Sequence, residues 1–117
     1  MVAFMDIQPI TRGHLLVVPR QHAVLLHEVD ALSSTQAWQV VTRMAEALRR
    51  SGLPCEGVNV FVADGEVAFQ DVPHFHVHVI PRFTGDGFSL EFPPGYGQPV
   101  GRPELEAVAS AIRGATG

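Results

Sequence analysis

The stretch His74-Phe75-His76-Val77-His78-Val79-Ile80 alternates histidine with apolar residues. A period of two is typical of a β-strand, in which successive side chains point to opposite faces of the sheet. The pattern therefore predicts a strand over residues 74–80 with three imidazoles on one face. Phe75, Val77 and Val79 would point the other way, into the core. The strand would be anchored by its apolar side and would present titratable groups on the other.

Three interpretations of this histidine row are open from the residues alone. The first is a solvent-facing strand that is merely rich in histidine. The second is a metal site, because His-x-His pairs on strands bind zinc, although no acidic residue or cysteine is interleaved here. The third is nucleophilic and acid–base chemistry, because imidazole can attack, transfer protons and hold phosphate oxygens. Three of the six histidines of the chain lie in this row, which argues against the first interpretation. We favour the third.

Three separate stretches resemble the histidine triad (HIT) family. Residues 70–80, which place Gln70 four positions before the first histidine of the row, resemble the signature of that family. Phe4-Met5-Asp6-Ile7-Gln8-Pro9 resembles its nucleoside-binding strand, and Gly13-His14-Leu15-Leu16-Val17-Val18-Pro19 resembles the strand that follows. The stretches occur in the family's order and lie within residues 2–88. Within the family, the chain is similar to small bacterial Hint-like hydrolases.

The length and the charge narrow the class of protein. With 117 residues, the chain is expected to form a single domain over residues 1–117. The net charge of −4 argues against nucleic-acid binding, which needs a basic surface. Lysine is absent, so any phosphate contacts must come from arginine, histidine, backbone N–H groups or small polar side chains.

Cysteine usage and hydropathy indicate the compartment. Cys55 is the only cysteine, so an intrachain disulfide is impossible and a reducing environment is expected. The first residues lack the pattern of a signal peptide, and no apolar run approaches the length of a membrane span. We therefore expect a cytoplasmic protein with no membrane partner.

The pattern along the chain predicts an α+β fold. We expect an antiparallel meander sheet, a short helix within residues 20–29, one long helix, and a loop over 84–102 that is rich in proline and glycine. A C-terminal helix over 103–112 would complete the 84–117 segment. The strands of the sheet are expected at residues 2–6, 14–18, 57–63 and 74–80.

The long helix is expected to begin at a capping box formed by Ser33 and Gln36. Apolar residues then recur at intervals of three and four and predict one stripe that packs against the sheet. The members of this stripe are Ala37, Val40, Val41, Met44, Ala45 and Leu48.

The resemblance implies a chemistry for the histidine row. His76 would attack the α-phosphorus of a nucleoside phosphoramidate or a dinucleoside polyphosphate, and water would then hydrolyse the nucleotidyl-histidine. A backbone carbonyl at the first histidine would fix the tautomer of this nucleophile. His78 would hold non-bridging phosphate oxygens, while His74 and His14 would support the array. This chemistry needs no metal, so no cofactor is expected.

The resemblance also implies residues that bind a purine nucleotide. Asp6 would accept hydrogen bonds from the ribose hydroxyls, with a cap at the strand end as its alternative role, and Phe4 and Ile7 would flank the base. Gln70 and Asp71 would lie near the phosphate and the leaving group. Relatives carry a further helix and strand before residue 2, so either the start of the chain is truncated or the base pocket is built differently here.

Three positions near the expected phosphate site depart from the family pattern. Asp71 stands where relatives carry serine or threonine, and an ionised carboxylate cannot donate a hydrogen bond. Ala63 replaces an amide side chain, and Phe69 replaces a glycine. We expect an intact nucleophile with an altered preference for the leaving group.

The resemblance implies a homodimer, which would cover the open edges of a short sheet. Two other classes of protein remain as alternatives. One is a metalloprotein with His14, His74, His76 and His78 as ligands. The other is a non-catalytic dimer that binds purine nucleotides.

Overall fold

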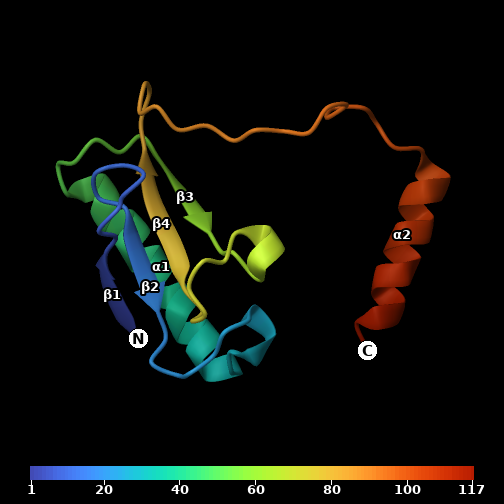
Figure 1. Cartoon of the computed structure of the whole chain (residues 1–117), viewed down its shortest axis with the longest axis horizontal. Helices are drawn as coiled ribbons and strands as arrows, with labels where there is room; N and C mark the ends of the chain where they lie inside the picture. The colour runs from blue at the N-terminus through green and yellow to red at the C-terminus, as the bar shows by residue number, and fades with distance from the viewer.

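The structure is a computed structural model that describes residues 1–117 (Figure 1). It contains four strands, two α-helices and two short 3₁₀ helices, which confirms the predicted α+β class. The elements in chain order are β1 (Val2–Met5), β2 (Leu15–Val18), η1 (Leu26–Glu28), α1 (Ala31–Arg50), β3 (Gly57–Phe61), η2 (Glu66–Ala68), β4 (Val77–Arg82) and α2 (Arg102–Ala115).

All neighbouring strands of the sheet are antiparallel, in the order β1-β2-β4-β3. The predicted antiparallel sheet is therefore present, but its strands do not follow one another in chain order as in a simple meander. After β2 the chain crosses through α1 to the far edge and forms β3. It then returns, so that β4 lies between β2 and β3, with His78 in the middle of the sheet and His76 just before the strand.

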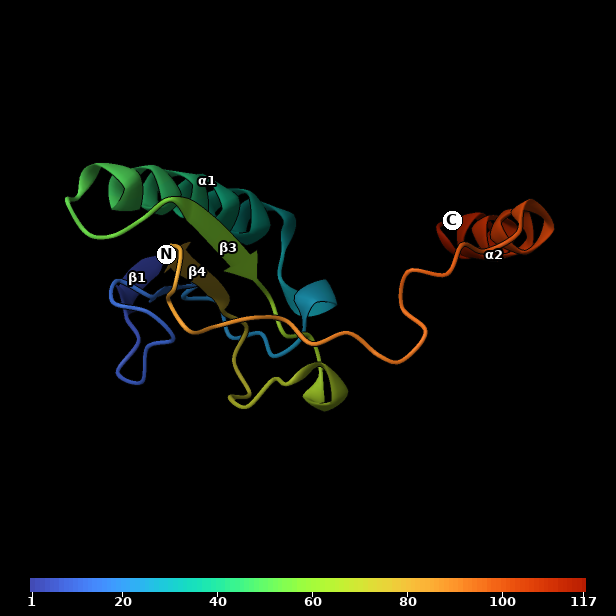
Figure 2. The same cartoon turned by 90° about the horizontal axis from the view of Figure 1, so that it is seen from above.

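Helix α1 covers one face of the sheet, as Figure 2 shows from above. The predicted stripe of α1 is at least half-buried throughout, and Val41 and Leu48 belong to the hydrophobic core. Phe75, Val77 and Val79 point into the same core, as their alternation with histidine predicted. No helix covers the opposite face of the sheet, and this face carries His76 and His78.

Two predicted boundaries were wrong for identifiable reasons. Helix α1 begins at Ala31 and not after Ser33, because the carboxylate of Asp30 accepts a hydrogen bond from the backbone N–H of Ser33 at 2.7 Å and caps the helix. Strand β4 begins at Val77, because the preceding segment bonds to a loop and not to a strand. The backbone N–H of Phe75 donates to the carbonyl of Ala23 at 2.7 Å.

Helix α2 stands apart from the sheet (Figures 1 and 2). None of its residues is buried, and an extended segment connects it to the end of β4. The radius of gyration is 17.1 Å, whereas a compact domain of this length has about 13 Å. Neither α1 nor α2 combines the length and the apolar character that crossing a membrane would require.

Candidate active site

The candidate site lies on the sheet face opposite α1. Strand pairing places His78 between Leu16 of β2 and Phe61 of β3, so these three side chains form one row across the sheet. The rings of His76 and His78 meet edge to face, with centroids 4.9 Å apart. His78 in β4 and His76 just before it thus bring two imidazoles into contact on the uncovered face.

A backbone carbonyl holds the ring of His76. Its Nδ1 lies 2.8 Å from the carbonyl oxygen of His74, and a carbonyl can only accept, so a neutral His76 ring carries its proton on Nδ1. The lone pair is then on Nε2. The carbonyl contact implied by the HIT resemblance is therefore present, and His76 has the tautomer that nucleophilic attack requires.

A chain of hydrogen bonds gives His78 the opposite tautomer. The backbone N–H of Ile10 donates to Nδ1 of His14 at 3.0 Å, so a neutral His14 carries its proton on Nε2. That nitrogen lies 2.9 Å from Nδ1 of His78 and donates to it. A neutral His78 consequently carries its proton on Nε2. The site therefore presents an acceptor nitrogen on His76 next to a donor N–H on His78.

A tight turn fixes the position of His14 in this series of hydrogen bonds. Gly13 precedes it with φ +102°, a conformation that L side chains rarely adopt. A Cβ at this position would meet Leu53 and Pro81 at 3.2 Å. The hydroxyl of Thr11 donates to the carbonyl of Pro81 at 2.6 Å and ties the turn to the end of β4. His14 is thus set by the backbone of two elements.

Burial keeps the hydrogen-bonded pair His14 and His78 neutral. Desolvation lowers the pKa of His14, while the nearby carboxylate of Asp6 acts in the opposite direction. Desolvation also lowers the pKa of His78, and the neighbouring His76 and His14 add to this effect. The carboxylates of Asp6 and Asp71 partly oppose it. Both imidazoles are therefore neutral at pH 7, as the hydrogen-bond chain requires.

His74 contributes through its backbone, while its side chain turns elsewhere. Its Nε2 lies 3.0 Å from the carbonyl of Pro19, and its ring contacts the edge of His22. The alternation predicted three imidazoles side by side, but only His76 and His78 meet in that way. The reason is that the His74 ring, in the loop before β4, is bonded to the carbonyl of Pro19.

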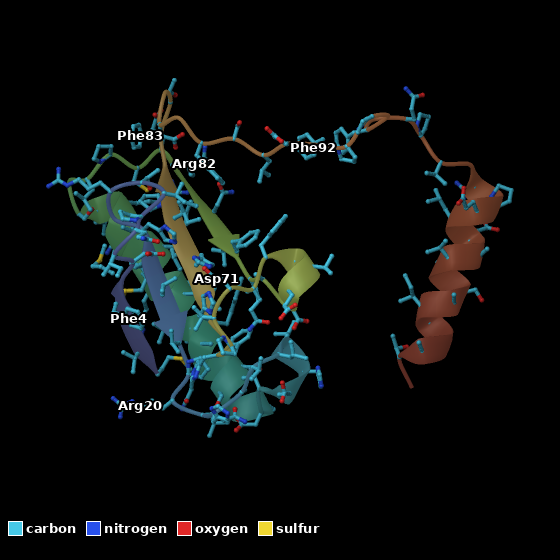
Figure 3. The ribbon with its side chains drawn as sticks, viewed as in Figure 1. Phe4, Arg20, Asp71, Arg82, Phe83 and Phe92 are labelled. Atoms are coloured by element: carbon cyan, nitrogen blue, oxygen red, sulfur yellow. The ribbon has the colours of Figure 1, made fainter.

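An apolar hollow adjoins the side of the row that contains His74 and His76. It has a volume of about 290 Å³ and is formed by the outer side chains of β1 and β2 with the loop before β4. Figure 3 shows Phe4 on β1 at the border of the sheet. The residues that line this first hollow are Phe4, Leu16, Val18, Val72, His74 and His76.

Two predicted nucleoside-binding residues lie outside this first hollow. Ile7 is 95% exposed and does not line the hollow. Asp6 accepts from the backbone N–H of Gln8 at 2.8 Å, the capping role considered for it, and its second oxygen lies 3.6 Å from Nε2 of His14. Contact of either residue with a nucleoside stays a prediction.

Gln70 and Asp71 lie in the loop that precedes β4. The side-chain amide of Gln70 is occupied by backbone groups. It accepts from Gly65 N–H and donates to the carbonyl of Val72 in this loop and to that of Val24 in the segment after β2. The carboxylate of Asp71 is exposed and close enough to His78 to affect its pKa. Gln70 shapes the loop, whereas Asp71 adds negative charge to the site. Nucleotide binding by either stays a prediction.

One cluster of potential metal ligands overlaps this site. Ligand atoms of Asp6, His14 and His78 all lie within 4.8 Å of one another. A cation at this position would have to displace the hydrogen bond between His14 and His78, because both ring nitrogens of His14 already have partners. The cluster differs from the four-histidine set considered from the sequence, since His74 and His76 are not part of it.

Some groups of the site carried no signal in the sequence. The N–H of Ile10 and the carbonyl of Pro19 act through the backbone, which any residue type provides. Phe61 lies 5.7 Å from His78 between ring centroids, and only the strand register identifies it as a neighbour. Its place could have been inferred only from a correct pairing of β3 with β4.

The fold and the site define a class of protein. It is an α+β protein with histidines on the open face of an antiparallel sheet, one of which has a tautomer that leaves the Nε2 lone pair available. The sequence model of the HIT domain matches residues 1–85. The chain therefore belongs to the HIT family, as its motifs indicated.

Relatives support this assignment over most of the chain. An uncharacterised HIT-like protein of Borreliella burgdorferi is 40% identical over 77% of this chain and 66% of its own length. Adenosine 5′-monophosphoramidase of Saccharomyces cerevisiae is 36% identical over 68% of this chain. This chain spans less than two thirds of either protein, with 48% of the yeast enzyme covered.

Solved structures of the family resemble this fold. A HIT family protein of Bacillus subtilis has a TM-score of 0.86 at 32% identity, with 98% of this chain and 81% of that protein covered. A zinc-bound histidine triad protein of Mycobacterium smegmatis has a TM-score of 0.70 at 38% identity, with 97% and 80% covered. The first similarity extends over α2, because 2% of the chain is too little to contain its 14 residues.

Proposed function

We propose that the protein hydrolyses nucleotide derivatives at the α-phosphate through a nucleotidyl-histidine at His76. Nucleoside phosphoramidates and dinucleoside polyphosphates are the substrate classes. The observation that carries the proposal is the pair of opposite tautomers, which places a free Nε2 on His76 beside an N–H donor on His78. The yeast relative that bears the name adenosine 5′-monophosphoramidase supports the same chemistry.

Each group of the site would have its own role in this reaction. The base and ribose would occupy the first hollow, where Phe4 and Leu16 offer an apolar wall. The lone pair of His76 Nε2 would bond to phosphorus from the side of the sheet. The bond from phosphorus to the amine nitrogen, or to the bridging oxygen of a polyphosphate, would break, and the leaving group would take that electron pair and a proton. The Nε2–H of His78 would donate to a non-bridging oxygen, on which negative charge grows as the bond forms. Water would then attack the nucleotidyl-histidine, break its bond between phosphorus and His76 Nε2, and release the nucleoside monophosphate.

The test is release of AMP from adenosine phosphoramidate and from a diadenosine polyphosphate. We expect His76→Ala to lower kcat by about a thousandfold or more, since it removes the attacking atom. His27→Ala is a matched control, because His27 is exposed on η1 and does not line the first hollow. Mass spectrometry of protein denatured at alkaline pH, where a phosphorus–nitrogen bond survives, should show a nucleotide adduct at His76. Turnover that survives in His76→Ala would contradict the proposal.

The same assay separates the two other classes. Activity lost to a chelator and restored by zinc would support metal ligation, for which Asp6, His14 and His78 are the nearest set of ligands and the zinc-bound M. smegmatis protein is a precedent. Tight binding of AMP without turnover would support a non-catalytic nucleotide-binding protein.

We also propose that the protein is a homodimer held in part by α2. An apolar stripe on this helix, formed by Leu105, Val108 and Ile112, is between 51% and 60% exposed. A helix with no support from its own chain would not be expected to keep its place, yet α2 lies within the region that matches the B. subtilis crystal structure. A second copy of the chain would account for both observations by burying the stripe.

A further inference from the structure

The loop between η2 and β4 carries a carboxylate without a partner. The neighbours of Asp71 on both sides, Gln70 and Val72, take part in hydrogen bonds, whereas no hydrogen bond or ion pair engages the exposed carboxylate of Asp71 itself. Figure 2 shows this loop on the side of the sheet away from α1, and Figure 3 shows Asp71 beside β4. The free carboxylate therefore lies over the face that carries the candidate site.

A second hollow adjoins the first one at this loop. Its volume is about 280 Å³, and Val72 lines both hollows. Asp71 and Glu66 contribute two carboxylates to its wall, and both side chains are exposed, so water reaches the hollow. Only Asp71 of these two acts on the imidazole of His78. The second hollow thus brings water and one carboxylate to the border of the site.

Hydrogen bonds of Gln70 restrict where the carboxylate of Asp71 can lie. The Gln70 side chain accepts from the N–H of Gly65 at 2.9 Å and donates to the carbonyl of Val24 at 2.7 Å. It also donates to the carbonyl of Val72 at 3.2 Å, so the backbone is tied down on both sides of Asp71. A short side chain on a fixed backbone has few positions open to it, and little entropy is lost when it orients a reactant.

The other acceptor atoms around His78 are already engaged. Nδ1 of His78 accepts from His14, and its Nε2 carries a proton. One oxygen of Asp6 accepts a backbone N–H, and the other lies 3.6 Å from Nε2 of His14. Once His76 is bonded to phosphorus, its Nε2 has no lone pair left. Of the two carboxylates that act on His78, only that of Asp71 has both oxygens free to accept a proton.

We propose that Asp71 is the general base of the hydrolytic half of the reaction, in which its carboxylate takes a proton from the water that attacks the nucleotidyl-histidine. This rests on the proposed function. His76 bonds to phosphorus from the side of the sheet, so water in line with that bond arrives from the opposite, solvent side. The loop that carries Asp71 lies on that side of the sheet. A carboxylate within reach of the attacking water can act as its base.

The proposed step balances as follows. The oxygen of water forms a bond to phosphorus as the bond from phosphorus to His76 Nε2 breaks, and the electron pair of the broken bond returns to the ring. One proton of the water passes to the carboxylate of Asp71 and from there to solvent. The second proton stays on the new phosphate oxygen or is lost to solvent. The products are a nucleoside monophosphate and the original neutral His76.

The experiment follows the 4-nitroanilide of AMP, an adenosine phosphoramidate whose amine leaves readily and absorbs light when free. We expect Asp71→Asn to release about one equivalent of nitroaniline as fast as the wild type and then to turn over about a hundredfold more slowly, because it lacks the base. Mass spectrometry at alkaline pH should find most of the variant, and little of the wild type, as nucleotidyl-His76. Asn has the shape of Asp, and the exposed side chain holds no partner, so the fold is kept.

Glu66→Gln is the matched control, because it removes an exposed carboxylate from the same hollow that does not act on His78. It should change neither phase. A slower first release in Asp71→Asn without accumulation of the adduct would overturn the inference and assign the carboxylate to the leaving group. An unchanged second phase, or equal slowing in the control, would also overturn it.

The same assay keeps the two proposals apart. In each of those outcomes, release of AMP that depends on His76 would leave the proposed function standing. A wild type that releases no nitroaniline, or that releases it as fast as His76→Ala, would overturn both.

Discussion

The carboxylates of Asp6 and Asp71 both act to raise the pKa of His78, and only that of Asp6 acts on the pKa of His14. Asp6 favours the charged form of both imidazoles, whereas Asp71 favours that of His78 alone. Because His14 donates to His78, the protonation of one ring determines what the other can do. The two carboxylates therefore allow the titration of each imidazole to be changed separately.

Neutralising these carboxylates should give two different results. Asp6→Asn should lower the pKa of both His14 and His78 further, because it removes a charge that favours the imidazolium. Asp71→Asn should lower the pKa of His78 and leave that of His14 unchanged. NMR titration of the histidine ring resonances measures both values. Glu104→Gln, on α2, is the control and should move neither, and equal shifts in both aspartate variants would contradict the assignment.

Stability should fall as the pH drops below about 6.5. The pKa values of His14 and His78 are lower in the folded state than in the unfolded chain, so the unfolded chain binds more protons between the two values. The free energy of unfolding is then highest above this pH range and decreases as the pH falls through it. Urea unfolding between pH 8 and pH 5 measures the change. Greater stability at pH 5 than at pH 7 would contradict the assignment of lowered pKa values.

At the scale of elements, the turn before β2 determines where His14 lies. Gly13→Ala should destabilise the fold by about 2 kcal/mol or more, because strain at positive φ adds to contacts of 3.2 Å with Leu53 and Pro81. Gly52→Ala is a matched control, with φ +85° and open space around its Cβ, and should cost about 1 kcal/mol. Equal losses in chemical denaturation would show that packing at Gly13 contributes nothing.

From the sequence, the helices and strands could be predicted more accurately than the residues at which they begin and end. The period-two row placed Phe75, Val77 and Val79 in the core, and the period of the long helix identified its buried stripe. The helix start was misplaced because Asp30 and Ser33 are both good caps, and only the backbone geometry selects between them. The order of the strands in the sheet could not be predicted from the sequence, since the position of β4 between β2 and β3 depends on long-range pairing.

Only part of the candidate site could be predicted: its histidines, but not the backbone groups that orient them. Its histidines have a distinctive side-chain type and spacing, so the row and its resemblance could be recognised. The groups that fix their tautomers are mostly backbone atoms, such as the N–H of Ile10 and the carbonyls of His74 and Pro19. Backbone atoms are the same in every residue, and only the folded chain brings them to the imidazoles.

For the whole molecule, the proposed dimer should depend on one face of α2. Light scattering should give twice the mass of the 12.7 kDa chain for the wild type. Val108→Glu should shift the mass toward that of a monomer, because it puts a charge into the apolar stripe. Ser110→Glu adds the same charge on the opposite side of the helix and should leave the dimer intact. A monomeric wild type, or equal effects of both variants, would contradict the proposal.

Strand β4 and the residue before it serve two faces of the sheet at once, with core residues at Val77 and Val79 and site residues at His76 and His78. Neighbouring positions along one short strand are thus under different selective demands. Mutations at the core positions would be selected for their effect on abundance, whereas those at the site positions would be selected for the reaction. An evolving lineage can therefore change what the open face recognises, one alternate position at a time, while the half of the sheet that keeps the protein folded is inherited intact.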